Sequence, residues 1–298
     1  MRNPMKMIKT RYIKYILIVL ALLNIAACGI KMKVHDPAQI KGIFWQPDLD
    51  TTPPKGNWHL LGVNTFVPQW SIVDSKSWIS EIDHTERWNK SISLSQLRKK
   101  LWAKNIILGT AGEYNEPKAR QNVIALGAQA EKLIHQHLDV QGYYFPVEAD
   151  PSWQQVHLLG KVLEKLPIPF WVSIYSGETN PSHYSLWVKS WLPEKDKVFF
   201  QDGVGTGVRT PQQALNIYND LEKDLGKNRT AIVLEAFRPD HKGGFRSAYP
   251  WEIIQQLKAY EGKTVYIFDG PHYLNRTSVL IISLWYKVYY ANSHPTKA

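Results

Sequence analysis

Two glutamates in this chain each end a short apolar run. Glu148 ends the run YYFPVE at 143–148, and Glu235 ends the run TAIVLE at 230–235. Continuous apolar runs of this length are typical of strands that are buried on both faces of a parallel sheet. If both strands belong to one parallel barrel, both carboxyl groups lie at its C-terminal rim, where such barrels do their chemistry. Two facing carboxyl groups can cleave a glycosidic bond, one as general acid and the other as nucleophile or base.

Polar and aromatic side chains also follow the other predicted strands. Asp202 could bond a sugar hydroxyl, orient a catalytic glutamate, or serve only as a turn residue before Gly203. Tyr175 could hydrogen-bond to the nucleophile. The remaining candidate substrate-binding residues at this rim are Trp45, Gln69, Trp70, Asp150, Trp153, Gln201 and Asp269. For the three tryptophans, stacking on a sugar face and packing in the core both stay open.

Other kinds of chemistry lack a matching pattern. His135 and His137 are two residues apart on a predicted helix and so point to different sides, and the other histidines have no ligand spacing, so we expect no metal and no cofactor. The glycines at 203, 205 and 207 precede a predicted helix and could cradle a phosphate, but no Lys-Ser/Thr signature follows them. No Gly-x-Ser-x-Gly elbow indicates a serine nucleophile.

The predicted elements alternate between apolar runs and longer amphipathic stretches, which predicts an α/β fold with a parallel sheet. The candidate strands are 42–46, 59–67, 105–110, 142–148, 169–175, 198–202, 231–235 and 265–269. Eight such strands predict a single (β/α)8 TIM barrel, in which Glu148 ends the fourth strand and Glu235 the seventh.

The predicted helices are uneven in length. Spacing of apolar residues predicts helices over 115–137, 152–166, 210–225, 249–260 and 278–290. Ser152 and Thr210 are expected N-caps, and Pro211 suits the first helical position. The segment 47–58 is short and contains Pro53 and Pro54, so we expect the first helix of the barrel to be eroded.

The N-terminus has the features of a targeting segment. Five basic residues within 2–14 precede a largely apolar stretch of thirteen residues at 15–27, which is short for a bilayer span and suits a signal peptide. The run IAACG at 25–29 resembles a bacterial lipobox, which implies lipidation of Cys28, the sole cysteine of the chain. Gly29 after this cysteine resembles outer-membrane sorting, so we expect a lipid-anchored protein of the cell envelope.

These signals predict three regions: a signal peptide at 1–27, a lipidated cysteine and tether at 28–40, and a barrel domain at 41–298. The net charge of +10 falls to +5 when the five basic residues of the leader are subtracted. A mildly basic mature chain does not indicate nucleic acid, and it is compatible with an acidic polysaccharide or an anionic membrane surface. The oligomeric state stays open. The twelve tryptophans fit a sugar-binding cleft as well as a core.

Several segments resemble a family of secreted bacterial barrels that is catalogued as a domain of unknown function and is similar to glycoside hydrolases. The segments are IYSG at 174–177, a helix with Trp187 and Trp191, FFQDGVG at 199–205, GVNTFVPQW at 62–70 and YYFPVE at 143–148. The resemblance spans about residues 40–275 and implies a (β/α)8 fold and a carbohydrate substrate.

A wider similarity is to the clan of retaining glycosidases whose acid/base lies on strand four and whose nucleophile lies on strand seven. Glu148 and Glu235 match those two positions. That clan usually has asparagine directly before the strand-four glutamate, where this chain has Val147. The similarity therefore implies the two carboxylate roles, whereas the sugar contact that the asparagine makes is absent.

Three functions follow as expectations. The first is a lipid-anchored glycoside hydrolase that acts on a cell-envelope or exported polysaccharide, with two glutamates in a retaining mechanism. The second is a catalytically silent barrel that binds polysaccharide during export or surface assembly. The third is a structural envelope lipoprotein without a sugar ligand.

Overall fold

The computed structural model describes residues 36–291. The predicted signal peptide, Cys28 and most of the tether therefore lie outside the described residues. The chain divides into a large compact unit, 37–283, and a smaller one formed by its two ends, of which Asp36 and 284–291 are described. All the strands belong to the larger unit. The first strand starts at Gln39, so the tether ends slightly earlier than expected.

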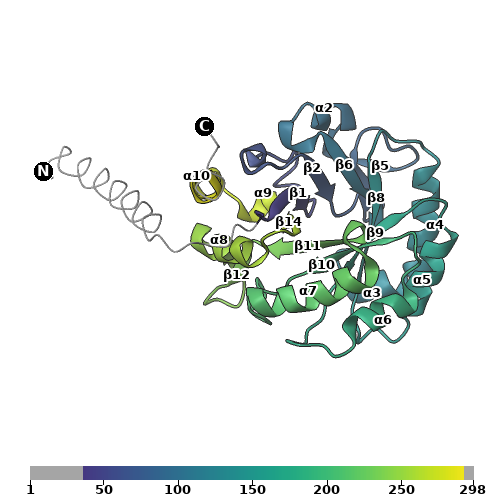
Figure 1. The fold of residues 1–298 in the computed structure, drawn as a ribbon. Coiled ribbons are helices and arrows are strands. Elements are labelled where there is room, and N and C mark those ends of the chain that lie inside the picture. Colours follow the sequence, from purple (N-terminus) through teal and green to yellow (C-terminus); the bar gives the residue numbers. More distant parts are fainter. Residues whose placement is uncertain (1–35, 292–298) are drawn as a thin grey trace, which may run out of the picture. The chain divides into compact units, whose positions relative to one another are not determined.

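Eight parallel strands close into a barrel within the described residues (Figure 1). Their order around the barrel follows the chain, with the last strand pairing with the first. The strands are β1 (Gln39–Trp45), β2 (Thr65–Pro68), β6 (Asn105–Gly109), β8 (Gly142–Ala149), β9 (Phe170–Ile174), β10 (Lys197–Gln201), β11 (Thr230–Glu235) and β14 (Thr264–Phe268). The predicted (β/α)8 TIM barrel is confirmed, and each predicted strand overlaps one observed strand.

The barrel interior is packed with side chains, many of them aromatic. Phe199 lies near its centre, stacked on Trp171 with ring centroids 4.2 Å apart and edge-on to Phe44 at 4.9 Å. Tyr144 and Tyr266 belong to the same cluster, and the Tyr144 hydroxyl donates to Ser173 Oγ at 2.9 Å. This filling makes the lower barrel a core, so any ligand site must lie above it at the rim.

Helices cover the outside of the barrel (Figure 1). They are α3 (Glu116–Gln121), α4 (Val123–Ile134), α5 (Val156–Lys165), α6 (Tyr184–Trp191), α7 (Pro211–Leu225) and α8 (Pro250–Ala259). Two helices follow β14, namely α9 (Gly270–Tyr273) and α10 (Arg276–Ala291), and α10 from residue 284 onward belongs to the smaller unit. Thr210 caps α7 in a capping box with Gln213, as predicted. The helix predicted over 115–137 is interrupted at Asn122. Ser152 is not the N-cap of α5, which starts four residues later after Gln155.

The first helix of the barrel is eroded, as predicted. Only the short 3-10 helix η1 (Trp58–Leu61) lies between β1 and β2, and Gly62 ends it in the left-handed region at φ 88°. The prediction of strand over 59–67 was therefore wrong in its first half. Gly62 stops the helical turn because residues other than glycine rarely adopt this backbone conformation.

Two β insertions at the rim were not predicted. The first is a four-stranded sheet formed by β3 (Ile72–Val73), β4 (Lys76–Ile79), β5 (Glu86–Ile92) and β7 (Ala111–Gly112). The second is a hairpin formed by β12 (Phe237–Pro239) and β13 (Phe245–Ser247). The short helices are α2 (Leu94–Arg98), η2 (Leu101–Ala103) and η3 (Lys227–Arg229).

Candidate active site

Strand alternation directs a set of polar side chains into the mouth of the barrel. Phe199 and Val233 belong to the interior cluster. Side chains two residues further along a strand lie on the same face, so Gln201 and Glu235 continue that inward face at the rim. Because β8, β9, β10 and β11 are consecutive in the barrel, Glu148, Tyr175, Gln201 and Glu235 come from adjacent strand ends.

The backbone that carries Glu148 is irregular. Between Phe145 and Ala149 the strand β8 advances four residues, whereas its partner β9 advances only two, from Val172 to Ile174. Bulges of this kind re-aim side chains at barrel rims. The bulge therefore determines how Glu148 is presented to the barrel mouth.

Helix α3 holds this bulge at its backbone. The backbone N–H of Glu148 donates to Glu116 Oε1 at 2.7 Å, and its carbonyl accepts from Arg120 Nε at 3.1 Å. Glu116 and Arg120 are themselves 3.4 Å apart in an i,i+4 ion pair. Both backbone groups of Glu148 are thus satisfied by charged side chains, which fixes the residue in the absence of regular strand pairing.

The surroundings of Glu148 favour its protonated form. Burial, followed by the neighbouring Glu116 carboxylate, raises the pKa of Glu148 to about 7. Arg120 and a side-chain hydrogen bond with Gln201 oppose this shift. A carboxyl group that titrates near neutral pH can hold a proton and deliver it, as a general acid must.

Glu235 is bound by the loop that follows β10. Its Oε2 accepts from the backbone N–H of Gly205 at 2.7 Å and from that of Thr206 at 3.2 Å. A Cβ atom at Gly205 would lie 2.5 Å from Glu235 Cβ and 2.8 Å from Oε2. Only glycine therefore allows the loop to approach this carboxyl group. The backbone N–H groups that could have bound a phosphate bind Glu235 instead.

The charge state of Glu235 is set by opposing influences. Burial, then the negative charge of Asp202, raises the pKa of Glu235, and Glu148 contributes in the same direction. The two backbone donors oppose the shift. Glu235 is only 3% exposed. Asp202 is the charged neighbour that raises the pKa of Glu235 most, and Glu148 makes the smallest of these contributions.

Asp202 lies behind Glu235 and is completely buried. Its Oδ1 accepts from the backbone N–H of Val204 at 3.0 Å and of Glu235 at 3.4 Å. Its Oδ2 accepts from Gln256 Nε2 at 2.7 Å and from the Tyr260 hydroxyl at 2.9 Å. These four donors leave Asp202 closed to a sugar hydroxyl. The assignment as a substrate-binding residue does not agree with this burial, and the contacts instead make Asp202 a positioning residue for Glu235.

Gln201 and Tyr175 lie at the strand ends between those of the two glutamates, and each has one contact on its own side. The Gln201 side chain hydrogen-bonds to Glu148. The Tyr175 hydroxyl lies 3.5 Å from Thr206 Oγ1, in the loop that binds Glu235. Both residues are partly exposed. The hydrogen bond expected between Tyr175 and the nucleophile is thus replaced by a contact through the loop.

Two of the expected tryptophan platforms belong to the core. Trp45 is completely buried, donates to Thr51 Oγ1 at 2.8 Å and packs edge-on to Trp78. Trp70 is 1% exposed and packs edge-on to Tyr114 at 5.0 Å. Neither ring has a face open to a sugar, which does not agree with their assignment as stacking platforms.

Three further candidates remain near the mouth. Gln69 is partly buried, and its Oε1 has no hydrogen-bond partner. Asp150 and Trp153 follow β8. Asp150 Oδ1 accepts from the backbone N–H of Ser152 at 2.8 Å, and the guanidinium of Arg120 lies 5.6 Å from the Trp153 ring centroid. Asp150 thus orders the turn in which Ser152 was expected to act as N-cap.

Asp269 lies at the end of β14, the strand that pairs with β11, and is 1% exposed. Its Oδ2 accepts from the backbone N–H of Gln46 at 2.6 Å and lies 2.9 Å from His272 Nδ1. His272 Nε2 lies 2.6 Å from Asp48 Oδ2. Asp269, His272 and Asp48 therefore form a carboxylate–imidazole–carboxylate clasp where the last strand meets the first. This burial does not agree with a direct sugar contact for Asp269.

Sequence reasoning missed the residues that support the two glutamates, namely Glu116, Arg120, Gln256 and Tyr260. Gln256 lies on the buried face of α8 with Ile253 and Leu257, and the buried Tyr260, four residues later, is the C-cap of this helix. A glutamine within an apolar helix stripe is a usable signal, because a buried amide requires a polar partner.

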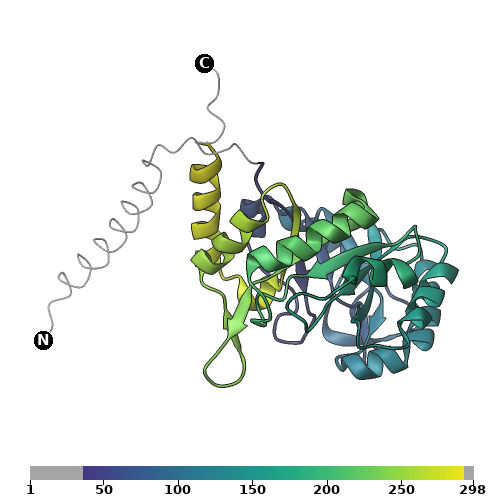
Figure 2. The same ribbon diagram turned by 60° about the horizontal axis from the view of Figure 1, so that its bottom comes forward.

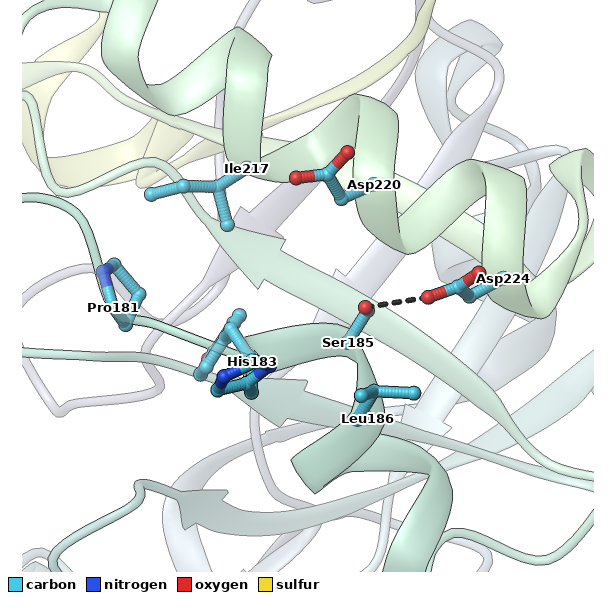
Figure 3. A pocket seen from close by; sticks show the side chains of 8 residues that line it. Pro181, His183, Ser185, Leu186, Ile217, Asp220 and Asp224 are labelled. Atoms are coloured by element: carbon cyan, nitrogen blue, oxygen red, sulfur yellow. Dashed lines mark hydrogen bonds between the residues drawn. The ribbon is translucent and has the colours of Figure 1, made fainter.

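A cavity of about 290 Å³ lies between α6 and α7, outside the barrel (Figure 3). Asp220 and Asp224 line it, and Ser185 Oγ donates to Asp224 Oδ2 at 2.5 Å. None of the predicted site residues belongs to it. Within residues 36–291, no group of three His, Cys, Asp or Glu side chains is arranged to hold a metal ion. In the same range no helix is long and apolar enough to cross a membrane.

Solved structures with this fold include carbohydrate-active enzymes. A protein from Bacteroides thetaiotaomicron assigned as an alpha-L-fucosidase matches with a TM-score of 0.58 and 13% identity, over 89% of this chain and 98% of that chain. The PgaB (BpsB) glycoside hydrolase domain from Bordetella bronchiseptica matches with a TM-score of 0.50 and 10% identity, over 83% and 98%. A chitinase from Chromobacterium violaceum matches with a TM-score of 0.43 and 8% identity, over 83% and 99%.

The sequence itself matches no family model and no curated protein. At such low identity, likeness to solved structures establishes the fold alone. The chain therefore has a TIM barrel similar in fold to the first two of these proteins, and its function must be argued from the site.

Proposed function

We propose that this protein is a glycoside hydrolase that acts on a cell-envelope or exported polysaccharide. Glu148 is the acid/base and Glu235 the nucleophile of a retaining mechanism. The observation that carries the proposal is the position of two carboxyl groups at the ends of the fourth and seventh strands: Gln201 hydrogen-bonds to Glu148, and the backbone N–H groups of Gly205 and Thr206 donate to Glu235. In the clan of retaining glycosidases that this sequence resembles, the fourth and seventh strands carry the two catalytic carboxylates, which together cleave the glycosidic bond.

The supporting contacts match the two roles. The pKa of Glu148, raised to about 7, suits a group that first donates a proton to the leaving oxygen and then takes one from water. The N–H groups of Gly205 and Thr206 stabilise the ionised form of Glu235 that attack requires. Gln201 and Trp153 are partly exposed beside this pair and are the proposed sugar contacts.

The test is turnover by purified full-length protein in detergent, against a panel of polysaccharides and aryl glycosides. We expect Glu235→Gln to lower kcat by at least about a thousandfold, because the amide cannot form the glycosyl-enzyme bond. Glu148→Gln should spare kcat/KM for aryl glycosides whose leaving group needs no proton, and should lower kcat, because water is no longer activated for the second step. Glu131→Gln, at an exposed position on α4, is the matched control. Normal turnover by Glu235→Gln would contradict the assignment of Glu235 as nucleophile. NMR of the first-formed anomer tests whether the anomeric configuration is retained.

A second function, a catalytically silent barrel that binds polysaccharide, is favoured by one observation. Glu235 is 3% exposed and its pKa is raised by burial and Asp202, which disfavours the ionised nucleophile. Under this alternative the protein binds a polysaccharide without hydrolysing it, and Glu148→Gln leaves the affinity unchanged. Equilibrium binding and product analysis on the same panel distinguish the two functions.

Lipid anchoring through Cys28 belongs to the same proposal. A lipidated N-terminus would hold the barrel at a membrane of the cell envelope, the outer membrane in a Gram-negative cell, close to a polysaccharide that is made or exported there.

A further inference from the structure

The β12–β13 hairpin follows directly after the strand that carries Glu235. It starts at Phe237, two residues after the candidate nucleophile, and Figure 2 shows it projecting from the barrel as an extended loop. The tip is ordered by Asp240, whose Oδ1 accepts from the backbone N–H groups of Lys242 at 2.7 Å and Gly244 at 2.9 Å. The hairpin is thus a preformed projection at the rim.

A line of aromatic rings runs from Glu235 onto this hairpin. A Cβ atom at Gly205 would lie 2.5 Å from Glu235 Cβ and 2.8 Å from Phe237 Cε2, so the Phe237 ring lies beside the carboxyl group. Phe237 packs edge-on to Phe245 at 4.7 Å and at a tilt to Tyr273 at 5.2 Å. Phe237 is 7% exposed, whereas Phe245 is 51% exposed. The rings become accessible with distance from the carboxyl group.

The two faces of the hairpin differ, because Arg246 follows Phe245 directly in β13 and its side chain points to the opposite face. The Arg246 guanidinium forms a bidentate pair with Glu252 at 2.8 and 2.9 Å and lies 4.3 Å from the Tyr249 ring centroid. The ion pair occupies one face, and the other face presents the accessible Phe245 ring, on which the C–H face of a sugar can stack. A single exposed ring offers far less than the roughly 800 Å² per partner of a stable protein interface.

We propose that the β12–β13 hairpin is a glycan-binding platform: Phe245, supported by Phe237, stacks on a sugar residue of a polysaccharide several units from the bond at Glu148 and Glu235. The inference deepens the proposed function and rests on it. The continuity of the rings with Glu235 is the reason for choosing a glycan, since a chain held at the carboxyl pair and leaving past β11 meets this hairpin. The platform gives the enzyme a preference for long chains over short ones.

The experiment measures affinity in the full-length Glu235→Gln protein. The probes are cello-, laminari-, xylo- and chito-hexaose and a hexameric oligoalginate, each with its disaccharide. Adding Phe245→Ala should raise the Kd of whichever hexasaccharide binds by about three- to tenfold, which is the effect expected from the loss of one stacking contact. Its disaccharide should bind unchanged. Phe245→Trp should retain the affinity, and Ile124→Ala, at a 64% exposed position on α4, is the control.

Equal hexasaccharide affinity with and without Phe245, or no binding to any probe, overturns the platform. Loss of binding to phosphatidylglycerol vesicles in Phe245→Ala, without loss of glycan binding, assigns the ring to a lipid surface and also overturns it. Failure of the proposed hydrolysis is seen separately, as absence of turnover by the wild-type protein. If the wild-type protein shows no turnover but its glycan affinity depends on Phe245, the hairpin is still a glycan-binding platform, and the barrel that carries it is catalytically inactive.

Discussion

At the scale of single residues, Glu235 depends on a glycine. A side chain at Gly205 would collide with Glu235 Cβ and Oε2 and would displace the two N–H donors of the loop. We expect Gly205→Ala to lower kcat by about a hundredfold, because loss of a fixed donor to a reacting carboxylate typically costs 2–4 kcal/mol. Gly177→Ala is the control, since a Cβ atom there meets nothing within 4 Å. Equal kcat values for the two variants, measured on one aryl glycoside, would contradict the role of the loop.

Glu116 is predicted to tune the proton on Glu148. Its carboxylate raises the pKa of Glu148, and its Oε1 accepts the Glu148 N–H. Glu116→Gln keeps an acceptor and removes the charge, so the pKa of Glu148 should fall. Activity of the wild type should decline as pH rises through about 7, since the general acid is then lost, and the variant should decline at lower pH. An unshifted basic limb in the pH profile of kcat/KM would exclude this electrostatic role.

At the scale of elements, the clasp of Asp48, His272 and Asp269 joins the β1 and β14 ends. The Asp269 hydrogen bond, then the charges of both carboxylates, raises the pKa of His272 to about 9 from its ordinary value near 6.5. Because the folded-state pKa is the higher one, the stabilisation is complete below about pH 6.5 and is lost as pH rises through 9.

The corresponding variant is His272→Gln. Urea unfolding at pH 6 should show a free energy of unfolding about 1–3 kcal/mol below that of the wild type, and the difference should shrink by pH 9.5. Asp48 and Asp269 face the imidazole, and both must be ionised for this sign to hold. His157→Gln, at an exposed position on α5, is the control. A difference that does not change with pH would mean that the clasp acts through packing alone.

The elements also explain what the sequence could predict. Uninterrupted apolar runs identified all eight barrel strands. A strand that is buried on both faces is apolar along its whole length, and this pattern can be recognised without knowing which strands pair with it. The first half of 59–67 is equally apolar but forms η1, since Gly62 turns the chain before the strand starts. Local pattern alone does not distinguish a short buried turn from a short buried strand.

Residues of the candidate site could be predicted from the sequence where the alternation of side chains along a strand was taken into account. Glu148, Gln201 and Glu235 come together at the mouth, as their positions at strand ends indicated. Asp202 follows Gln201 directly, so its side chain points to the opposite face, toward Gln256 and Tyr260 on α8. The bulge in β8 and the rim insertions depend on contacts between distant segments, which one sequence without its fold does not reveal.

At the scale of the whole molecule, the residues that stabilise the barrel and the candidate catalytic residues lie in different parts of it. The interior is closed by aromatic packing, the β14–β1 junction is joined by the clasp, and the carboxyl pair lies across β8–β11. Stability and chemistry thus involve mostly separate residues. Variants of the clasp and of Glu148, whose strand β8 lies across the barrel from β14, should therefore be close to additive in unfolding free energy.

The N-terminal region belongs to this scale because it determines where the barrel acts. If the lipobox-like run is processed, Cys28 is the only thiol of the chain that can take a lipid. Cys28→Ser should then move the protein from the membrane fraction to the soluble fraction of a Gram-negative host and abolish incorporation of labelled palmitate. Turnover of a soluble aryl glycoside should be unchanged, because the described barrel starts after residue 36. Membrane association that survives Cys28→Ser would show that another segment attaches the protein, and the proposed anchor would be wrong while the carboxyl pair could still be catalytic.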